Sequence, residues 1–184
     1  MTAYNVMLVL SSKVNLSEWI AFAARLLPAD GQLYVRALVT VEAGKSLSEG
    51  ALVVREWRDA FRLHALAHRE IHDEVQVVVE HQPFQLIIQE IRDREINLLV
   101  AEWNPANSGV GGVLVDDLLA LSRCDIVLVA GIQQLLGESN QVLLSLRGGP
   151  NLSIGTQVAT AIAGQGSVTL FHAVDNRRTA PDLE

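Results

Sequence analysis

The sequence predicts an α/β fold in which a parallel, doubly wound sheet is followed by the opening part of a second copy of the same unit. Strand-like apolar runs alternate with helix-length amphipathic segments along the chain, and this alternation is typical of parallel sheets with right-handed crossovers. Hydrophobic residues make up 49% of the 184 residues, as expected for strands that are buried on both faces. The stretch that begins at Val6 also reappears, without gaps, from Val142.

The first unit divides into five strands and the helices between them. Apolar runs bounded by turn residues predict strands at 5–10, 33–41, 74–80, 97–103 and 125–129. Apolar residues at helical spacing predict helices at 16–27, 49–71, 84–94 and 113–122. Asn15 or Ser17 is suited to cap the first helix and Ser48 the second, and Pro83 suits the first turn of the third. The apolar stripe of the third helix is predicted to be buried, and it consists of Phe84, Ile87, Ile88 and Ile91.

The repeated stretch sets the predicted domain organisation. The run Asn15-Leu16-Ser17 matches Asn151-Leu152-Ser153, and a slip of one residue also pairs Gly31 with Gly166. Self-similarity at a fixed offset indicates duplicated structural units. We therefore expect a first domain at 1–131, a linker at 132–140, and the start of a second repeat at 141–184, with strand–helix–strand at 141–146, 152–163 and 167–174 and a polar tail. A unit that stops within its second copy suggests a piece of a longer protein.

Charge and cysteine content exclude several classes of partner. The net charge of −7 argues against nucleic acid, which favours a basic face. No apolar run approaches the roughly 20 residues of a membrane-spanning helix, so no direct membrane insertion is expected. The single cysteine, Cys124, fits a reducing compartment. These features predict a cytoplasmic protein or a domain on the cytosolic face of a membrane protein.

The loops after the strands are the candidate binding region, because ligands of such sheets lie beyond the carboxyl ends of the strands, near the switch in strand order. These loops are 11–13, 42–48 and 102–113. Glycines before a helix allow backbone N–H groups to approach an anion, and the sequence offers Gly109, Gly111 and Gly112 before Val113, with Ser11 after the first strand.

Carboxylates surround this glycine loop and favour a second interpretation. Glu102 ends the fourth strand, and Asp116 and Asp117 fall near the first turn of the next helix. No Lys or Arg occurs between Arg94 and Arg123 to offset them. Carboxylates at this position stabilise the helix dipole by themselves and repel a triphosphate that lacks a metal. The loop is therefore either a nucleotide cradle or a plain glycine turn that enters a self-capped helix.

The order of the elements, the glycine loop and the segment 112–129 (GVLVDDLLALSRCDIVLV) resemble the universal stress protein family. The resemblance covers 4–130 and again 141–175, and it implies a five-stranded parallel sheet, Rossmann-like, with strand order 3-2-1-4-5. The family's ATP motif has a hydroxyl residue after its third glycine, where this chain has Val113. Its first glycine is replaced by Glu102, and the aspartate after the first strand is replaced by Ser11. The resemblance thus implies a degenerate nucleotide-binding motif.

Further details resemble one branch of that family. Arg147-Gly148-Gly149-Pro150, Trp103 and the pattern at 115–119 are similar to the tandem stress-protein-like domains on the cytosolic ends of prokaryotic cation–chloride cotransporters, amino-acid permeases and chloride channels. The resemblance implies a non-catalytic regulatory or dimerisation domain without a cofactor, a homodimer, and a membrane-transporter portion of the same polypeptide as partner. The alternative is a stress-response protein that binds ATP or AMP through Ser11 and the segment Gly109–Val113, with Gly111 and Gly112 at its centre.

The remaining candidate residues favour structural roles. His64, His68 and His72 recur every fourth residue, as metal-binding histidines on one helix face do, but His64 falls on the predicted buried stripe while His72 is turned away. Neither a metal site nor a catalytic residue is therefore expected. Cys124 precedes an apolar strand and is predicted to be a buried, unreactive thiol.

Overall fold

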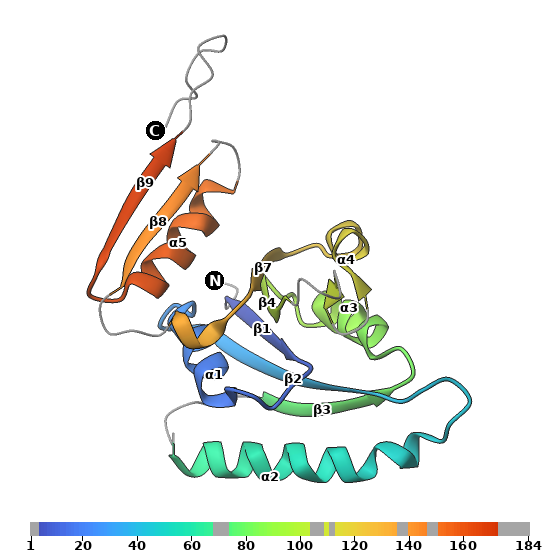
Figure 1. Cartoon of the computed structure of the whole chain (residues 1–184). Coiled ribbons are helices and arrows are strands. Elements are labelled where there is room, and N and C mark those ends of the chain that lie inside the picture. Colours follow the sequence, from blue (N-terminus) through green and yellow to red (C-terminus); the bar gives the residue numbers. More distant parts are fainter. Residues whose placement is uncertain are drawn as a thin grey trace. The chain divides into compact units, whose positions relative to one another are not determined.

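The computed structural model describes residues 4–67, 74–103, 109–110, 113–135, 140–146 and 151–172. The chain forms two compact units, Met1–Ile132 and Gln133–Glu184. Figure 1 labels the elements of both.

The first unit is built on a five-stranded sheet in which every pairing is parallel. Its strand order is β3-β2-β1-β4-β7, which confirms the predicted order 3-2-1-4-5. The strands are β1 (Asn5–Leu10), β2 (Gln32–Thr40), β3 (Glu74–Glu80), β4 (Leu98–Glu102) and β7 (Asp125–Val129). The predicted α/β class is therefore confirmed, with each strand within two residues of its expected bounds.

Helices cover both faces of this sheet, and the pleat of the strands decides which side chains meet them. Along β1, Met7 and Val9 belong to the core formed with α3 (Pro83–Asp93) and α4 (Val115–Leu121). The side chains between them point to the opposite face, which is covered by α1 (Leu16–Arg25) and α2 (Ala51–Ala67). Strands buried on both faces explain the apolar composition. The predicted stripe of α3 is confirmed as buried, with Phe84, Ile87, Ile88 and Ile91 all below 9% exposed.

The start of α2 differs from the prediction. A short 3-10 turn, Leu47–Gly50, precedes the helix, and Ser46 rather than Ser48 caps it. Ser46 Oγ accepts a hydrogen bond from the Ser48 N–H (3.3 Å), and Glu49 Oε1 accepts one from the Ser46 N–H (3.2 Å). This reciprocal pair is a capping box, which needs Glu or Gln three residues after the cap. Ser46 has Glu49 at that distance, whereas Ser48 has Ala51.

The glycine loop also differs from the prediction. Gly109–Val110 (β5) pairs antiparallel with Val113–Leu114 (β6), and α4 begins only at Val115. The helix predicted from 113 is therefore two residues shorter at its start. The expected loop leading directly into a helix is instead a small hairpin followed by the helix.

The second unit contains one strand–helix–strand motif. Strand β8 (Gln141–Leu146) pairs in parallel with β9 (Ser167–His172), and α5 (Leu152–Ala163) connects them. The sequence predicted these three elements, and the two-stranded sheet is present. A 3-10 turn, η2 (Ile132–Gln134), lies at the division between the two units.

Candidate functional site

The switch point of the sheet lies between β1 and β4. The chain leaves β1 toward β2 on one side and leaves β4 toward β7 on the other, so the loops that follow β1 and β4 diverge, and ligands bind there in this class of fold. Ser11 follows β1 and is exposed. Glu102 ends β4, and the N–H of Trp103 donates to the Val129 carbonyl at 2.8 Å, which ties this strand tip to β7.

Glu102 lies on the α1 side of the sheet. Leu99 and Ala101 belong to the core beneath α3 and α4, and side chains alternate along a strand. Glu102 therefore lies on the same face as Leu98 and Val100. This is the face of the sheet that α1 covers. It is half-buried. A negative charge thus stands at the switch point.

The described cations near the strand tips are already paired with carboxylates. Lys13, in the loop between β1 and α1, forms an ion pair with Glu56 of α2. Lys45, in the loop between β2 and α2, lies 2.7 Å from Glu42. Within the described parts of the loops that follow the five strands, these two lysines are the positive charges. An incoming phosphate would have to compete with Glu56 and Glu42 for them.

The hairpin β5–β6 reduces the number of backbone N–H groups of the glycine segment that are available to bind an anion. The backbones of Gly109 and Val113 pair with Leu114 and Val110, respectively. In an antiparallel pair, every second pair of opposite residues exchanges N–H···O bonds, so part of this backbone is engaged in the hairpin and does not belong to a nest of free N–H donors. Gly111 and Gly112 lie outside the described residues.

The start of α4 adds further negative charge. Asp116 and Asp117 occupy the first turn of α4, and both are exposed. Carboxylates at that end stabilise the helix by interacting with its dipole. Glu102 thus lies at the end of β4, and Asp116 and Asp117 lie at the start of α4. These are the positions that the sequence predicted on either side of the candidate loop.

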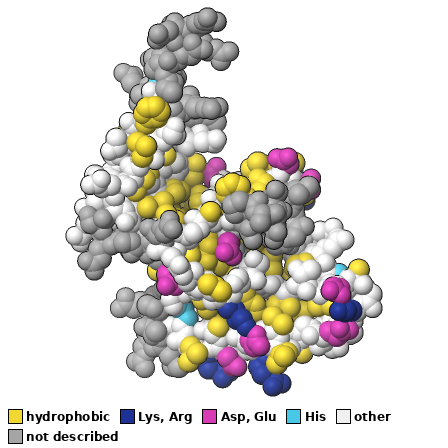
Figure 2. Space-filling view, in the orientation of Figure 1, with side chains coloured by type: hydrophobic (Ala, Val, Ile, Leu, Met, Phe, Trp, Pro, Cys, Tyr) yellow, Lys and Arg dark blue, Asp and Glu magenta, His cyan; other side chains and the backbone are white. Residues whose placement is uncertain are grey.

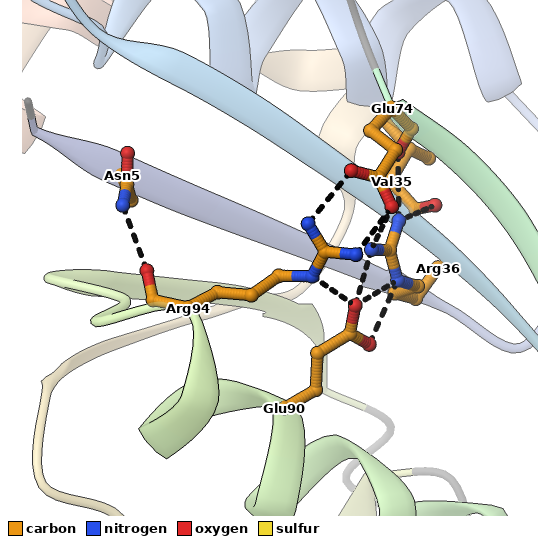
Figure 3. Close-up of polar contacts among 6 residues, drawn as sticks. All are labelled: Asn5, Val35, Arg36, Glu74, Glu90 and Arg94. Atoms are coloured by element: carbon orange, nitrogen blue, oxygen red, sulfur yellow. Dashed lines mark hydrogen bonds and ion pairs between the residues drawn. The ribbon is translucent and has the colours of Figure 1, made fainter.

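A buried charged cluster was missed by sequence reasoning (Figure 3). Arg36, in the middle of β2, has no exposed surface. Its Nε donates to both carboxylate oxygens of Glu90 of α3, at 3.0 and 2.8 Å, and Nη2 also contacts this carboxylate. Nη1 donates to the backbone carbonyl of Glu74 at 2.7 Å. The guanidinium therefore joins β2 to both β3 and α3.

Arg94, which follows α3, completes the cluster. Its Nη1 and Nη2 donate to the two carboxylate oxygens of Glu74, each at 2.7 Å, and its Nε donates to Glu90 at 2.8 Å. Both guanidinium groups also lie over the ring of Tyr34, at 5.6 Å for Arg36 and 4.9 Å for Arg94, a geometry that favours cation–π attraction. Two arginines and two glutamates neutralise one another.

The pKa of Glu90 records this environment. Burial by itself would raise the pKa of the Glu90 carboxyl, but the hydrogen bond and charge of Arg36, together with those of Arg94, outweigh burial and hold it below its usual 4.5. The cluster lies toward the amino ends of the strands, where β3 begins, and thus away from the strand-tip loops. We assign it a structural role. The signal in the sequence was an arginine within the apolar run of β2, at the alternation position shared by Tyr34 and Leu38.

The surroundings of Cys124 and His64 favour structural roles for these two residues. Cys124 is partly buried, and burial is the main cause that raises the pKa of its thiol to about 11. It is therefore protonated near neutral pH and is a poor nucleophile. Nδ1 of His64 lies 3.4 Å from Ser17 Oγ of α1, while His68 and His72 lie outside the described residues. No group of three metal-ligating side chains occurs among the described residues.

The first unit is thus a parallel α/β domain with a carboxylate, Glu102, at the switch point of its sheet. The described lysines of its strand-tip loops are paired with carboxylates. No protein-family model and no curated protein matches the chain. Among solved structures, the chain is similar to a universal stress protein in complex with cAMP, with 17% identity and a TM-score of 0.43 over 70% of this chain and 98% of that one.

Two more structures show a likeness of the same degree. The hypothetical protein MJ0577 has 12% identity and a TM-score of 0.48, over 71% of this chain and 97% of that one. The universal stress protein UspA from Lactobacillus plantarum has 16% identity and a TM-score of 0.38, over 70% and 99% of the respective chains. At these values the fold assignment rests on the strand order itself. Among the described residues, no helix has the length and apolar character needed to span a bilayer.

Proposed function

We propose that this chain is a non-catalytic regulatory and assembly domain of the universal stress protein type, with a degenerate nucleotide loop. The main support for this proposal is the negative charge of the residues around the switch point. Lys13 and Lys45 are each paired with a carboxylate, and Glu102 ends the strand beside which a phosphate would lie. A triphosphate brought here would meet uncompensated negative charge in a setting where repulsion is only partly screened.

The assembly part of the proposal is a homodimer in the cytosol, with a membrane-transporter portion of the same polypeptide as its partner. Closed two-fold dimers are the commonest oligomers, and both units present sheet edges that can extend by strand pairing. The link to a transporter rests on the resemblance carried by Arg147-Gly148-Gly149-Pro150, residues that lie outside those described. The lack of catalysis is supported by the protonated state of Cys124 and by the assignment of the Arg36 cluster to structure.

Isothermal titration calorimetry with nucleotides tests this proposal. Purified protein is titrated with ATP and Mg²⁺, and separately with ADP, AMP and cyclic nucleotides. We expect no binding heat up to millimolar ligand, which corresponds to a binding free energy weaker than about −4 kcal/mol. The variant Glu102→Gln provides a matched comparison, because it keeps the shape of the side chain and removes the charge.

Binding of any of these nucleotides to the native chain at micromolar concentration would contradict the proposal. The chain would then be a nucleotide sensor, as in the alternative interpretation, and Ser11 and the segment Gly109–Val113 would be the first residues to substitute.

A further inference from the structure

Strand β3 lies at one end of the strand order of the described sheet and pairs there with β2. The structure describes all seven of its residues, and Val78 alone among them is buried, in the core beneath α3 and α4. Figure 2 shows hydrophobic side chains at the surface of the first unit, above the charged side chains of α2. Within the first unit, the amino-terminal half of β3, residues 74–77, therefore adds no buried side chain to the core, whereas the carboxyl-terminal half, 78–80, does.

The carboxyl-terminal half of β3 is held by close packing and by backbone contacts. A side chain added at Gly50, just before α2, would lie 2.9 Å from Cγ1 of Val79, so the backbone of Gly50 packs directly on this residue. The N–H of Val41 donates to the Glu80 carbonyl at 3.0 Å, and Nδ1 of His81 lies 3.0 Å from the Val41 carbonyl. This end of β3 is thus tied both to the end of β2 and to the start of α2.

The amino-terminal half of β3 is held by the charged cluster instead. The two carboxylate oxygens of Glu74, the first residue of the strand, accept hydrogen bonds from Arg94, each at 2.7 Å. Nη2 of Arg36 donates to the same carboxylate at 3.1 Å, and Nη1 donates to the Glu74 backbone carbonyl at 2.7 Å. One residue of β3 therefore makes all the contacts that join this strand to the cluster in Figure 3.

The rest of the cluster can stay paired when Glu74 leaves it. A buried guanidinium without any partner carries a large cost, but Glu90 of α3 binds both Arg36 and Arg94 without the help of β3. Nη1 of Arg36 also keeps the Val35 carbonyl, at 3.1 Å. Release of Glu74 therefore breaks the bonds of one carboxylate and one carbonyl and leaves no buried charge without a counter-charge.

We propose that the amino-terminal half of β3 opens locally, with the contacts of Glu74 as its lock and residues 79–81 as its hinge. Segments with few buried side chains belong to the least stable part of a fold and open without the rest. Opening would uncover the edge of β2 at Tyr34–Arg36 and free the side of both guanidinium groups that faces Glu74. The lock lies at the opposite end of the sheet from the strand-tip loops, so this opening is independent of the proposed function.

Hydrogen exchange of the full chain, followed by NMR at several low urea concentrations, tests this local opening. The amides to compare are those that join 34–37 to 74–77, and those that join β1 to β4. We expect the first set to exchange faster and with a weaker urea dependence, because a local opening exposes less surface than unfolding of the sheet.

The variant Glu74→Gln tests the lock. A neutral amide loses the charge-assisted hydrogen bonds to the two arginines, so we expect exchange of the 34–37 to 74–77 amides to rise about tenfold or more. Glu80→Gln is the matched control, since it is the same substitution in the same strand and the described contact of Glu80 with β2 uses its backbone carbonyl. Its effect should stay below about threefold.

Two results would overturn this inference. Equal exchange free energies and equal urea dependences for the two sets of amides in the native chain would show that β3 opens only with the whole sheet, and this result requires no variant. Equal effects of Glu74→Gln and Glu80→Gln would show that the contacts of Glu74 are not the lock. Both results leave the nucleotide titration of the native chain unaffected, so failure here is distinct from failure of the proposed function.

Discussion

At the scale of single residues, the charged cluster around Arg36 is what sequence reasoning could least foresee. Pattern analysis places Arg36 in a strand and on a core-facing position, but it cannot supply partners that come from β3, from α3 and from the residue after α3. A buried guanidinium is tolerated only when its donors are satisfied, and here five donors meet two carboxylates and two backbone carbonyls. Such partners become visible only once the chain is folded.

Removing one charge of this cluster should destabilise the first unit strongly. Glu90→Gln removes the negative charge that faces the buried guanidinium of Arg36, and we expect a loss of about 3 kcal/mol in the free energy of unfolding, measured by urea denaturation at pH 7. Glu56→Gln is the control, because Glu56 pairs with Lys13 at the surface, where both side chains are more than a third exposed. It should change stability by less than about 1 kcal/mol. Equal effects of the two substitutions would contradict this assignment.

The stability difference between the native chain and Glu90→Gln should depend on pH. The pKa of Glu90 is lower in the folded chain than its usual 4.5, so the stabilisation is fully present above the unfolded pKa and is lost as the pH falls through the folded pKa. The stability gap between native chain and Glu90→Gln should therefore narrow below about pH 4. A gap that stays constant down to pH 3 would show that the carboxylate charge is not its source.

At the scale of elements, the strands were predictable and the connections were not. Strands that are buried on both faces, such as β1 and β4, are recognisable in the sequence as apolar runs. Strict alternation of strands and helices restricts the possible sheet topologies to a few. The hairpin β5–β6 has strands of two residues each, too short to show any periodicity. The expected cap at Ser48 differs by two residues from the observed cap of the 3-10 turn before α2, because several serines occur in the same loop. Only the spacing from Ser46 to Glu49 distinguishes them.

The capping box at the start of α2 gives a prediction at this scale. Ser46→Ala removes the acceptor of the Ser48 N–H and should lower the free energy of unfolding by about 1 kcal/mol. Ser48→Ala is the matched control in the same loop, since the described contact of its hydroxyl is with Ser46 Oγ (2.9 Å), and its effect should be smaller. Chemical denaturation of both variants decides between them, and a larger effect of Ser48→Ala would restore the cap expected from sequence.

At the scale of the whole molecule, the two units divide their properties. The first unit holds the five-stranded sheet, the described charges and the acidic strand tips, whereas the described part of the second unit contains no Asp, Glu, Lys or Arg. The sequence already showed the repeat and the acidic loop.

The most direct test of the account measures self-association of the chain with and without nucleotide. The dimer dissociation constant is determined by sedimentation in the absence and in the presence of about 5 mM ATP with Mg²⁺. Any ligand that prefers one assembly state must shift this constant. The account predicts a dimer whose dissociation constant is the same under both conditions. A dissociation constant that changes with nucleotide, or a chain that remains monomeric in both, would contradict it.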